Sequence, residues 1–404
     1  MEYRKRDRAL DVVRGICIVS MVIRHMSYGS FLDTGIHAPF WIDGAFGFVF
    51  LSGLVLGMMQ RSSTERTGQP NYRRLIDRAE LLFIISFGLL TLALIVGRAV
   101  ESNSGLPQAS AFDGWWNSLW LAATLQLPAR YLDILPMYVV LLIASTGAFA
   151  LLRHAKVTAL ALLSCGVYLL ALQWPSLTVL PALQESQAGF NWGAWQFPFV
   201  IAAIVGWNWK QWRLRETLLT KAALYISAGT FLTLSVLAQI LGRFNLTPGA
   251  PMRAWASDWF DKYNIGPGRI IFGLAAMVLA YWITTWLLDR QFLTPVLGFL
   301  ETLGARSLDS FVILCIAVIL IPAAAPYSRG GLWGNIASLT VIALCWSWSR
   351  FRASNRWPTR SPLGSGNRPR SLALKLEPPS RSDNADQGTR TPGPLRSRSG
   401  EDLQ

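Results

Sequence analysis

The apolar stretch LDVVRGICIVSMVIRHM, from Leu10 to Met26, contains two residues whose side chains could act in catalysis, Arg14 and His25. They are 11 positions apart. At about 100° per residue this equals three helical turns plus about 20°, so the two side chains share one helix face. They are about 16 Å apart along the helix axis. The stretch predicts a helix with a cation near one end and an imidazole deep toward the other.

Ionisable side chains in an apolar span are costly, and by default they indicate a functional site that faces the protein interior. Histidine is the side chain best suited to proton transfer near neutral pH, so we favour a functional His25 over a hydrogen-bonded core histidine. Two interpretations of Arg14 stand, a functional cation and an anchor at the membrane edge. Asp11 precedes Arg14 by three residues, so it can pair with the guanidinium and orient it.

Arg24 lies about 100° from the face shared by Arg14 and His25, because it is one residue away from His25. We expect it to reach the outer interface or to pair with an acid such as Asp33 or Asp43. His37 and His154 stand in predicted loops, where we expect solvated surface residues.

The composition indicates what kind of helices carry Arg14 and His25. Of the 404 residues, 52% are hydrophobic and 15% are charged, whereas soluble domains have about 25% charged residues. The apolar blocks predict an all-α polytopic membrane protein that crosses the lipid bilayer about ten times. The predicted spans are 12–29, 45–60, 79–97, 132–152, 157–173, 195–209, 220–241, 268–288, 308–325 and 331–349.

The net charge of +14 does not indicate a nucleic-acid partner, because the basic residues are scattered between apolar blocks and in the tail. Lys and Arg are more frequent on the side of the N-terminus than in the alternate loops, which predicts cytoplasmic termini and an even span count. Residues 1–349 are the predicted membrane domain. Residues 350–404 are rich in Pro, Ser, Gly and Arg and predict a disordered cytoplasmic tail.

The four cysteines lie inside apolar blocks and show no CxxC spacing, so neither a metal site nor a disulfide framework is expected. The loops on the outer side are rich in tryptophan, which indicates either an interfacial aromatic belt or a platform for stacking on sugar rings. These tryptophans are Trp41, Trp115, Trp116, Trp120, Trp192, Trp195, Trp255 and Trp259.

The first stretch resembles the opening of the acyltransferase type 3 superfamily, whose members carry an Arg, ten intervening residues and a His in the first span. DGAFGFVFLSGLVLG (Asp43–Gly57) is similar to the second-span signature of the OpgC branch, the glucan succinyltransferases. That branch usually has an acidic residue where this sequence has Phe46. Three later motifs resemble the same branch in the same order, so the resemblance covers about residues 6–347: YLDILPMYVVLLI, FNWGAWQFPFV and LGARSLDSFVI.

The resemblance implies transfer of an acyl group from a cytoplasmic acyl-CoA, with succinyl-CoA as the precedent, to a hydroxyl of an extracytoplasmic glycan. The bacterial inner membrane is the implied location, and no permanently bound cofactor is implied. Arg14, oriented by Asp11, would bind the donor phosphates or carboxylate. His25 would act as general base or carry the acyl group. Asp43 would orient the imidazole, or it caps the second span.

Four residues are candidates for the acceptor site: Asp133, Asn191, Trp195 and Gln196. Helix capping is the alternative for Asp133, and interfacial anchoring is the alternative for Trp195. Ser52 and Gly53 in FLSG are expected to be small residues that allow close helix packing. A glycan or lipid-linked sugar transporter is the alternative function, although the broken helices typical of transporters are not found. A non-catalytic member of the same fold is a further alternative.

Overall fold

A computed structural model describes residues 7–37, 44–100, 106–107, 109–127, 129, 132–179, 190–243, 258–324 and 328–354. The chain divides into two units, Met1–Gly364 and Ser365–Gln404. The described residues all belong to the first unit. Residues 350–354 of the predicted tail are helical, and residues 355–404 lie outside the described part of the chain.

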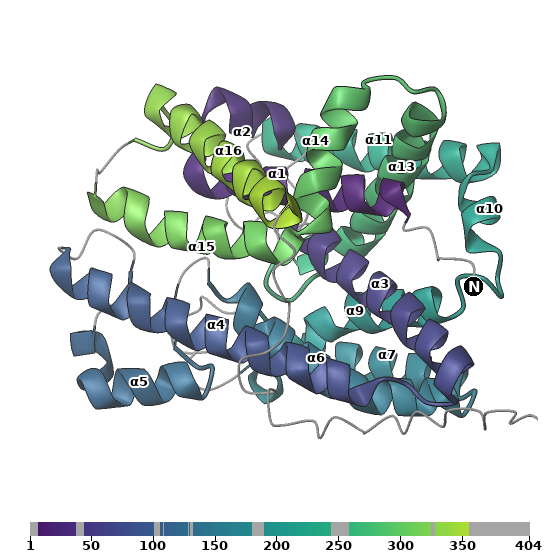
Figure 1. Cartoon of the computed structure of the whole chain (residues 1–404), viewed down its shortest axis with the longest axis horizontal. Helices are drawn as coiled ribbons and strands as arrows, with labels where there is room; N and C mark the ends of the chain where they lie inside the picture. Colours follow the sequence, from purple (N-terminus) through teal and green to yellow (C-terminus); the bar gives the residue numbers. More distant parts are fainter. Residues whose placement is uncertain are drawn as a thin grey trace, which may run out of the picture. The chain divides into compact units, whose positions relative to one another are not determined.

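The described residues form helices and connecting turns, without any strand (Figure 1). The α-helices are α1 (Arg8–Met26), α2 (Phe31–Ile36), α3 (Gly44–Thr67), α4 (Tyr72–Ala99), α5 (Trp115–Ala123), α6 (Ile134–Arg153), α7 (Val157–Gln173), α9 (Trp192–Trp207), α10 (Leu214–Leu218), α11 (Lys221–Arg243), α13 (Pro267–Asp289), α14 (Thr294–Ala305), α15 (Ser307–Ala324) and α16 (Leu332–Ser354). Two 3₁₀ helices are η2 (Ala109–Phe112) and η3 (Pro175–Leu177).

Each predicted span coincides with a helix, namely α1, α3, α4, α6, α7, α9, α11, α13, α15 and α16. Within the described residues, five of these are long and apolar enough to cross a membrane: α3, α4, α6, α13 and α15. Helices α7 and α9 and the segment Lys221–Leu237 of α11 are apolar but shorter. The architecture is therefore all-α and fits a membrane protein, whereas ten crossings and cytoplasmic termini stay predictions. Helices α2, α5, α10 and α14 were not expected from the apolar pattern.

Small residues let the central helices approach closely. A methyl group on Gly53 of α3 would lie 2.3 Å from the Phe199 carbonyl oxygen, and one on Gly206 of α9 would lie 2.0 Å from the Leu54 carbonyl oxygen. Any side chain at these positions would push α3 and α9 apart. The prediction that Gly53 of the FLSG motif is a close-packing residue is thus confirmed.

Helix α14 packs along the first half of α1, again through glycines. A methyl group on Gly304 would lie 1.7 Å from the Asp11 carbonyl oxygen, and one on Gly15 would lie 2.0 Å from the Leu300 carbonyl oxygen. The contact places α14 directly against the turn of α1 that carries Asp11 and Arg14.

We expect Gly304→Ala to destabilise the protein by about 1–3 kcal/mol, because the methyl group has no space against α1. Gly298 lies in the same helix and provides a matched control, because among the described residues no packed neighbour would lie within 4 Å of a methyl group there. Gly298→Ala should be neutral or should stabilise by about 0.5–1 kcal/mol, since alanine favours the helix. Thermal unfolding in detergent measures both variants. Equal melting temperatures for the two would contradict this packing.

Candidate functional site

Helix α1 holds both residues of the predicted pair in one unbroken element. The helix begins after Asp7, whose side chain accepts a hydrogen bond from the Ala9 N–H at 3.1 Å, and it ends at Met26. Residues 14 and 25 both lie within it. Their shared face and their separation of about 16 Å along the axis therefore follow from regular helix geometry.

Arg14 and Asp11 form a buried ion pair, as the sequence predicted. Arg14 Nη1 lies 3.5 Å from Asp11 Oδ1, and Arg14 Nη2 donates to the Leu51 carbonyl oxygen of α3 at 3.4 Å. Both residues are less than one tenth exposed. Buried charges need such partners because desolvation is costly. The pair fixes a positive group between α1 and α3.

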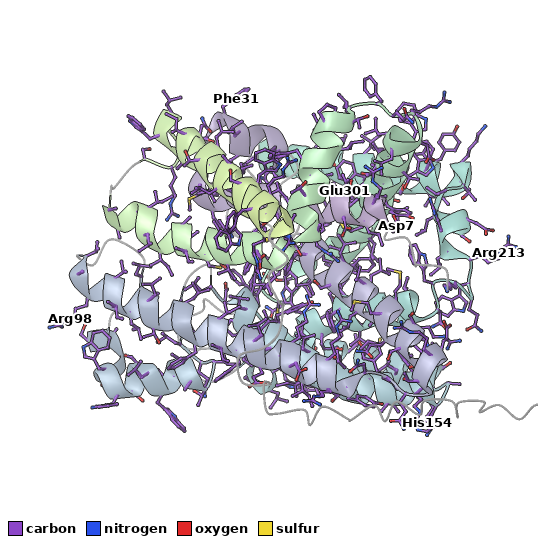
Figure 2. The ribbon with its side chains drawn as sticks, viewed as in Figure 1. Asp7, Phe31, Arg98, His154, Arg213 and Glu301 are labelled. Carbon is purple, nitrogen blue, oxygen red and sulfur yellow. The ribbon has the colours of Figure 1, made fainter. Side chains whose placement is uncertain are left out.

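The start of α1 is fastened by two further contacts. Tyr281 of α13 donates its hydroxyl to Asp7 Oδ2 at 3.0 Å. Arg8 pairs with Glu301 of α14 at 2.9 Å, and this hydrogen bond raises the pKa of Arg8. Figure 2 labels Asp7, before the start of α1, and Glu301, on α14. The charged turn of α1 is therefore held by α3, α13 and α14 together.

His25 is half-buried and is the penultimate residue of α1. Asp43, predicted to orient its imidazole, lies outside the described residues, so its role stays a prediction. Helix α3 begins at Gly44, where a methyl group would lie 2.5 Å from the Cys17 carbonyl oxygen of α1. The first turn of α3 thus packs directly on α1.

Phe46, which stands where the OpgC branch has an acid, is a core residue. It is 2% exposed and stacks on Phe50 with ring centroids 6.0 Å apart. A methyl group on Gly273 of α13 would lie 2.4 Å from the Phe46 ring. The aromatic ring therefore fills the contact between α3 and α13, and it offers no proton-transfer group there.

Asn191 was predicted to contact the acceptor, but its side chain forms hydrogen bonds within the protein. Its amide nitrogen donates to the Ala171 carbonyl at 3.1 Å and to Asn264 Oδ1 at 3.0 Å. Its oxygen accepts from the Thr178 hydroxyl at 2.7 Å and from the Ala194 N–H at 3.2 Å. Both donors and both acceptor positions of the amide are used, which favours a structural role over sugar binding.

Trp195 is fully buried and not at an interface, so the anchoring interpretation is wrong. Its indole N–H points to the carbonyls of Lys262 and Tyr263, at 3.3 and 3.2 Å. Gln196 exchanges two hydrogen bonds of 2.8 Å with Ser164 of α7. These side chains fasten α9 to α7 and to the loop before α13.

Asp133 occupies the N-cap position of α6, but its side chain makes no capping hydrogen bond. It is only half-buried. The capping alternative therefore gains no support from the geometry of this helix start. An acceptor role for Asp133 stays a prediction.

His37 was expected to be a solvated loop residue, and this expectation is wrong. It is 7% exposed, and its Nδ1 lies 2.9 Å from Asp33 Oδ1 while its Nε2 lies 2.9 Å from Ser20 Oγ. The reason is α2, a short helix that folds back against α1. The i,i+4 spacing of Asp33 and His37 is a signal that could have revealed the first contact, whereas the contact with Ser20 depends on tertiary packing.

Arg24 pairs with Asp33, one of the two acids that the sequence offered. Arg24 Nη1 lies 3.2 and 3.0 Å from the two carboxylate oxygens of Asp33, and its guanidinium lies 4.6 Å from the centre of the Tyr28 ring. Arg24 therefore belongs to the contact between α1 and α2 and not to the Arg14–His25 face. His154, by contrast, is exposed after α6, as predicted.

A cavity of about 280 Å³ lies between the C-terminal ends of α3 and α9. Its lining includes Arg61, Glu65, Trp207, Trp209 and Lys210, and Arg61 pairs with Glu65 at 3.0 Å. The Arg61 guanidinium lies 5.5 Å from the centre of the Trp207 ring. Trp209 contacts Tyr281, the residue that binds Asp7, so the cavity lies at the end of the bundle where α1 begins. Cationic and indole side chains together suit a ligand with phosphates and an aromatic base.

These helices and this site define a helical membrane protein with a buried cation and an imidazole on one face of its first helix. The chain belongs to the OpgC family, because the model of the OpgC protein family matches residues 6–357. No curated protein and no solved structure matches the chain. The family and the apolar helices fit a membrane glucan-modifying protein, and the family suggests a transferase role.

Proposed function

We propose that this protein is a multi-pass O-acyltransferase of the bacterial inner membrane. It would move an acyl group, with succinyl as the expected case, from a cytoplasmic acyl-CoA to hydroxyls of an extracytoplasmic glycan. The observation that carries the proposal is the buried Asp11–Arg14 pair on the same helix face as His25, in a chain of the OpgC family.

Arg14 suits recognition of a carboxylate inside the protein. Asp11 already demonstrates that a carboxylate can lie at 3.5 Å from the guanidinium. A succinyl group ends in a carboxylate, which the planar guanidinium fork would bind in the same manner. Because Arg14 is buried, only the narrow acyl end of a donor would reach it, and the nucleotide would stay outside.

His25 would act further along the same face as the general base toward the acceptor hydroxyl. The hydroxyl gives its proton to the imidazole as its oxygen bonds to the acyl carbon. The carbon–sulfur bond then breaks, and the leaving sulfur takes that proton from the imidazolium, so the donor leaves as a thiol. The separation of about 16 Å between Arg14 and His25 means that the acyl group must move along α1 between binding and transfer.

The direct test uses the full chain in lipid nanodiscs with radiolabelled acetyl-CoA or succinyl-CoA and a soluble glucan. Label that appears in the glucan, and is released by mild alkali, is the expected result. If no donor labels the glucan while the protein is folded, the enzyme interpretation fails. Movement of unmodified glucan across the membrane in liposomes would instead favour a transporter.

Within this proposal, the cavity at the ends of α3 and α9 would hold the nucleotide of the donor. We expect Lys210→Met to raise the KM for acyl-CoA about tenfold, as for loss of one charge-assisted hydrogen bond of about 1.5 kcal/mol. The kcat should stay the same, because Lys210 would not touch the reacting carbon. Initial rates at varied acyl-CoA concentration measure both constants.

Lys221→Met is the matched control, because Lys221 is exposed at the start of α11 and does not line the cavity. It should leave the KM unchanged. An unchanged KM in both variants would exclude this cavity as the nucleotide site.

A further inference from the structure

Ser20, His37 and Asp33 form a chain of contacts that the proposed mechanism does not use. Ser20 Oγ lies 2.9 Å from His37 Nε2, and His37 Nδ1 lies 2.9 Å from Asp33 Oδ1. All three residues are less than one tenth exposed. A hydroxyl, an imidazole and a carboxylate in this order are the arrangement that activates a serine nucleophile.

The Asp33 carboxylate influences which ring nitrogen of His37 carries the proton. Asp33 Oδ1 lies at ion-pair distance from His37 Nδ1, and a negative charge beside this nitrogen favours the neutral tautomer that carries its proton there. Nε2 is then the acceptor and the Ser20 hydroxyl is the donor. This is the tautomer in which His37 can remove the Ser20 proton.

Two further contacts hold Asp33 in place. The Gly29 N–H donates to Asp33 Oδ2 at 2.9 Å, and Arg24 Nη1 lies 3.0 Å from the same oxygen. These contacts balance the charge of the buried carboxylate and keep it aligned with His37. The Arg24 side chain is 41% exposed, so the chain of contacts runs from the protein surface inward to Ser20.

Ser20 lies between Arg14 and His25 along the axis of α1. It follows Arg14 by six residues and precedes His25 by five, which are about 9 and 8 Å along the helix axis. It lies about 120° around the helix from their shared face, so it is a separate centre. An acyl group that moves from the level of Arg14 to the level of His25 must pass the level of Ser20.

We propose that Ser20 is an acyl-accepting nucleophile, activated by His37 and Asp33, for which the donor is a thioester such as acyl-CoA. The Ser20 oxygen bonds to the thioester carbonyl carbon while its proton passes to His37 Nε2. The carbon–sulfur bond then breaks, and the leaving thiol takes the proton from His37. The products are an acyl ester on Ser20 and a free thiol. An acceptor hydroxyl then attacks this ester and gives its proton to His25, as in the proposed function, and that proton is returned to the Ser20 oxygen as it leaves.

This inference rests on the proposed acyl transfer for its donor, but it can be tested without a glycan. The full chain in nanodiscs is incubated with acetyl-CoA, with succinyl-CoA and with the small activated ester p-nitrophenyl acetate. Intact-mass measurement and peptide mapping then locate any acyl adduct. We expect an ester on Ser20 in the wild type and none in Ser20→Ala.

Two variants separate catalysis from folding. His37→Gln keeps a side chain that can bond to Ser20 but cannot take its proton through the transition state, so acylation should slow by about 10²–10⁴-fold. Ser27→Ala is the control, because Ser27 is also a buried serine and directly follows α1. Its hydroxyl donates to the Ile23 carbonyl and accepts from the Ser338 hydroxyl, and neither partner is a histidine. It should acylate like the wild type.

The outcomes distinguish the two proposals. Acylation of Ser20 without any labelled glucan would refute the proposed function and support this inference. Labelled glucan from Ser20→Ala at the wild-type rate, without an adduct in the wild type, would overturn this inference and leave the function standing. The three residues would then only fasten α2 to α1.

Discussion

Replacing His25 with alanine is expected to lower the kcat for glucan acylation by about 10²–10⁴-fold, the usual contribution of a general base. The physical reason is that the acceptor hydroxyl then has no positioned group to take its proton. The KM for acyl-CoA should change little, because the donor would be held near Arg14, about 16 Å away along α1. Initial rates with radiolabelled donor and glucan in nanodiscs measure the effect.

His154→Ala is the matched control for this experiment. His154 is exposed after the end of α6 and lies far along the chain from the predicted site. Figure 2 shows it at the margin of the molecule. The control should keep the wild-type rate. If His25→Ala transfers label as fast as His154→Ala, His25 is not the base, although the fold and the family would stand.

Replacing Arg14 with methionine should have the largest effect on stability, about 3–5 kcal/mol, because it leaves the Asp11 carboxylate buried without its cation. The loss should appear as a lower melting temperature and as unfolding at a lower denaturant concentration. The KM for succinyl-CoA should rise as well, since the carboxylate-binding fork is removed. Methionine fills a similar volume, so lost packing contributes little to the result.

A double-mutant cycle shows whether the pair itself is responsible. Asp11→Asn combined with Arg14→Met should recover much of the lost stability, because the uncompensated charge is removed. Arg213→Ala is the control, since its partner Glu216 and Arg213 itself are 64% and 74% exposed. An exposed pair contributes at most about 1 kcal/mol. Additive effects of Asp11→Asn and Arg14→Met would contradict a coupled buried pair.

The sequence predicted the long helices well because each contains a run of apolar residues, and such a run is visible without any neighbour; five of these helices are long and apolar enough to cross a membrane. It also predicted the Asp11–Arg14 pair, since an i,i+3 contact depends on helix geometry alone. Helix α14 was missed because its 12 residues are shorter than a span. Its position is set by Gly304 and Gly15 meeting α1, which is a tertiary contact.

The acceptor residues show where local patterns are insufficient. Asn191 and Trp195 carry groups that could bind a sugar, and they occur at a helix start where an outer site is plausible. The structure instead uses the hydrogen bonds of Asn191 within the protein and buries Trp195 completely. Whether a polar group is available to a ligand depends on its three-dimensional neighbours, which the order of residues does not contain.

The helical membrane architecture, the family resemblance and the single-faced Arg14–His25 pair could all be predicted from the order of residues, because they follow from apolar runs, motifs and helix periodicity. The contact of Ser20 with the Asp33–His37 pair, by contrast, depends on tertiary packing. Seventeen positions separate Ser20 from His37, and no periodicity relates them. The fold of α2 against α1 brings them within 2.9 Å, because burial of Asp33 requires the partners that Arg24 and His37 provide.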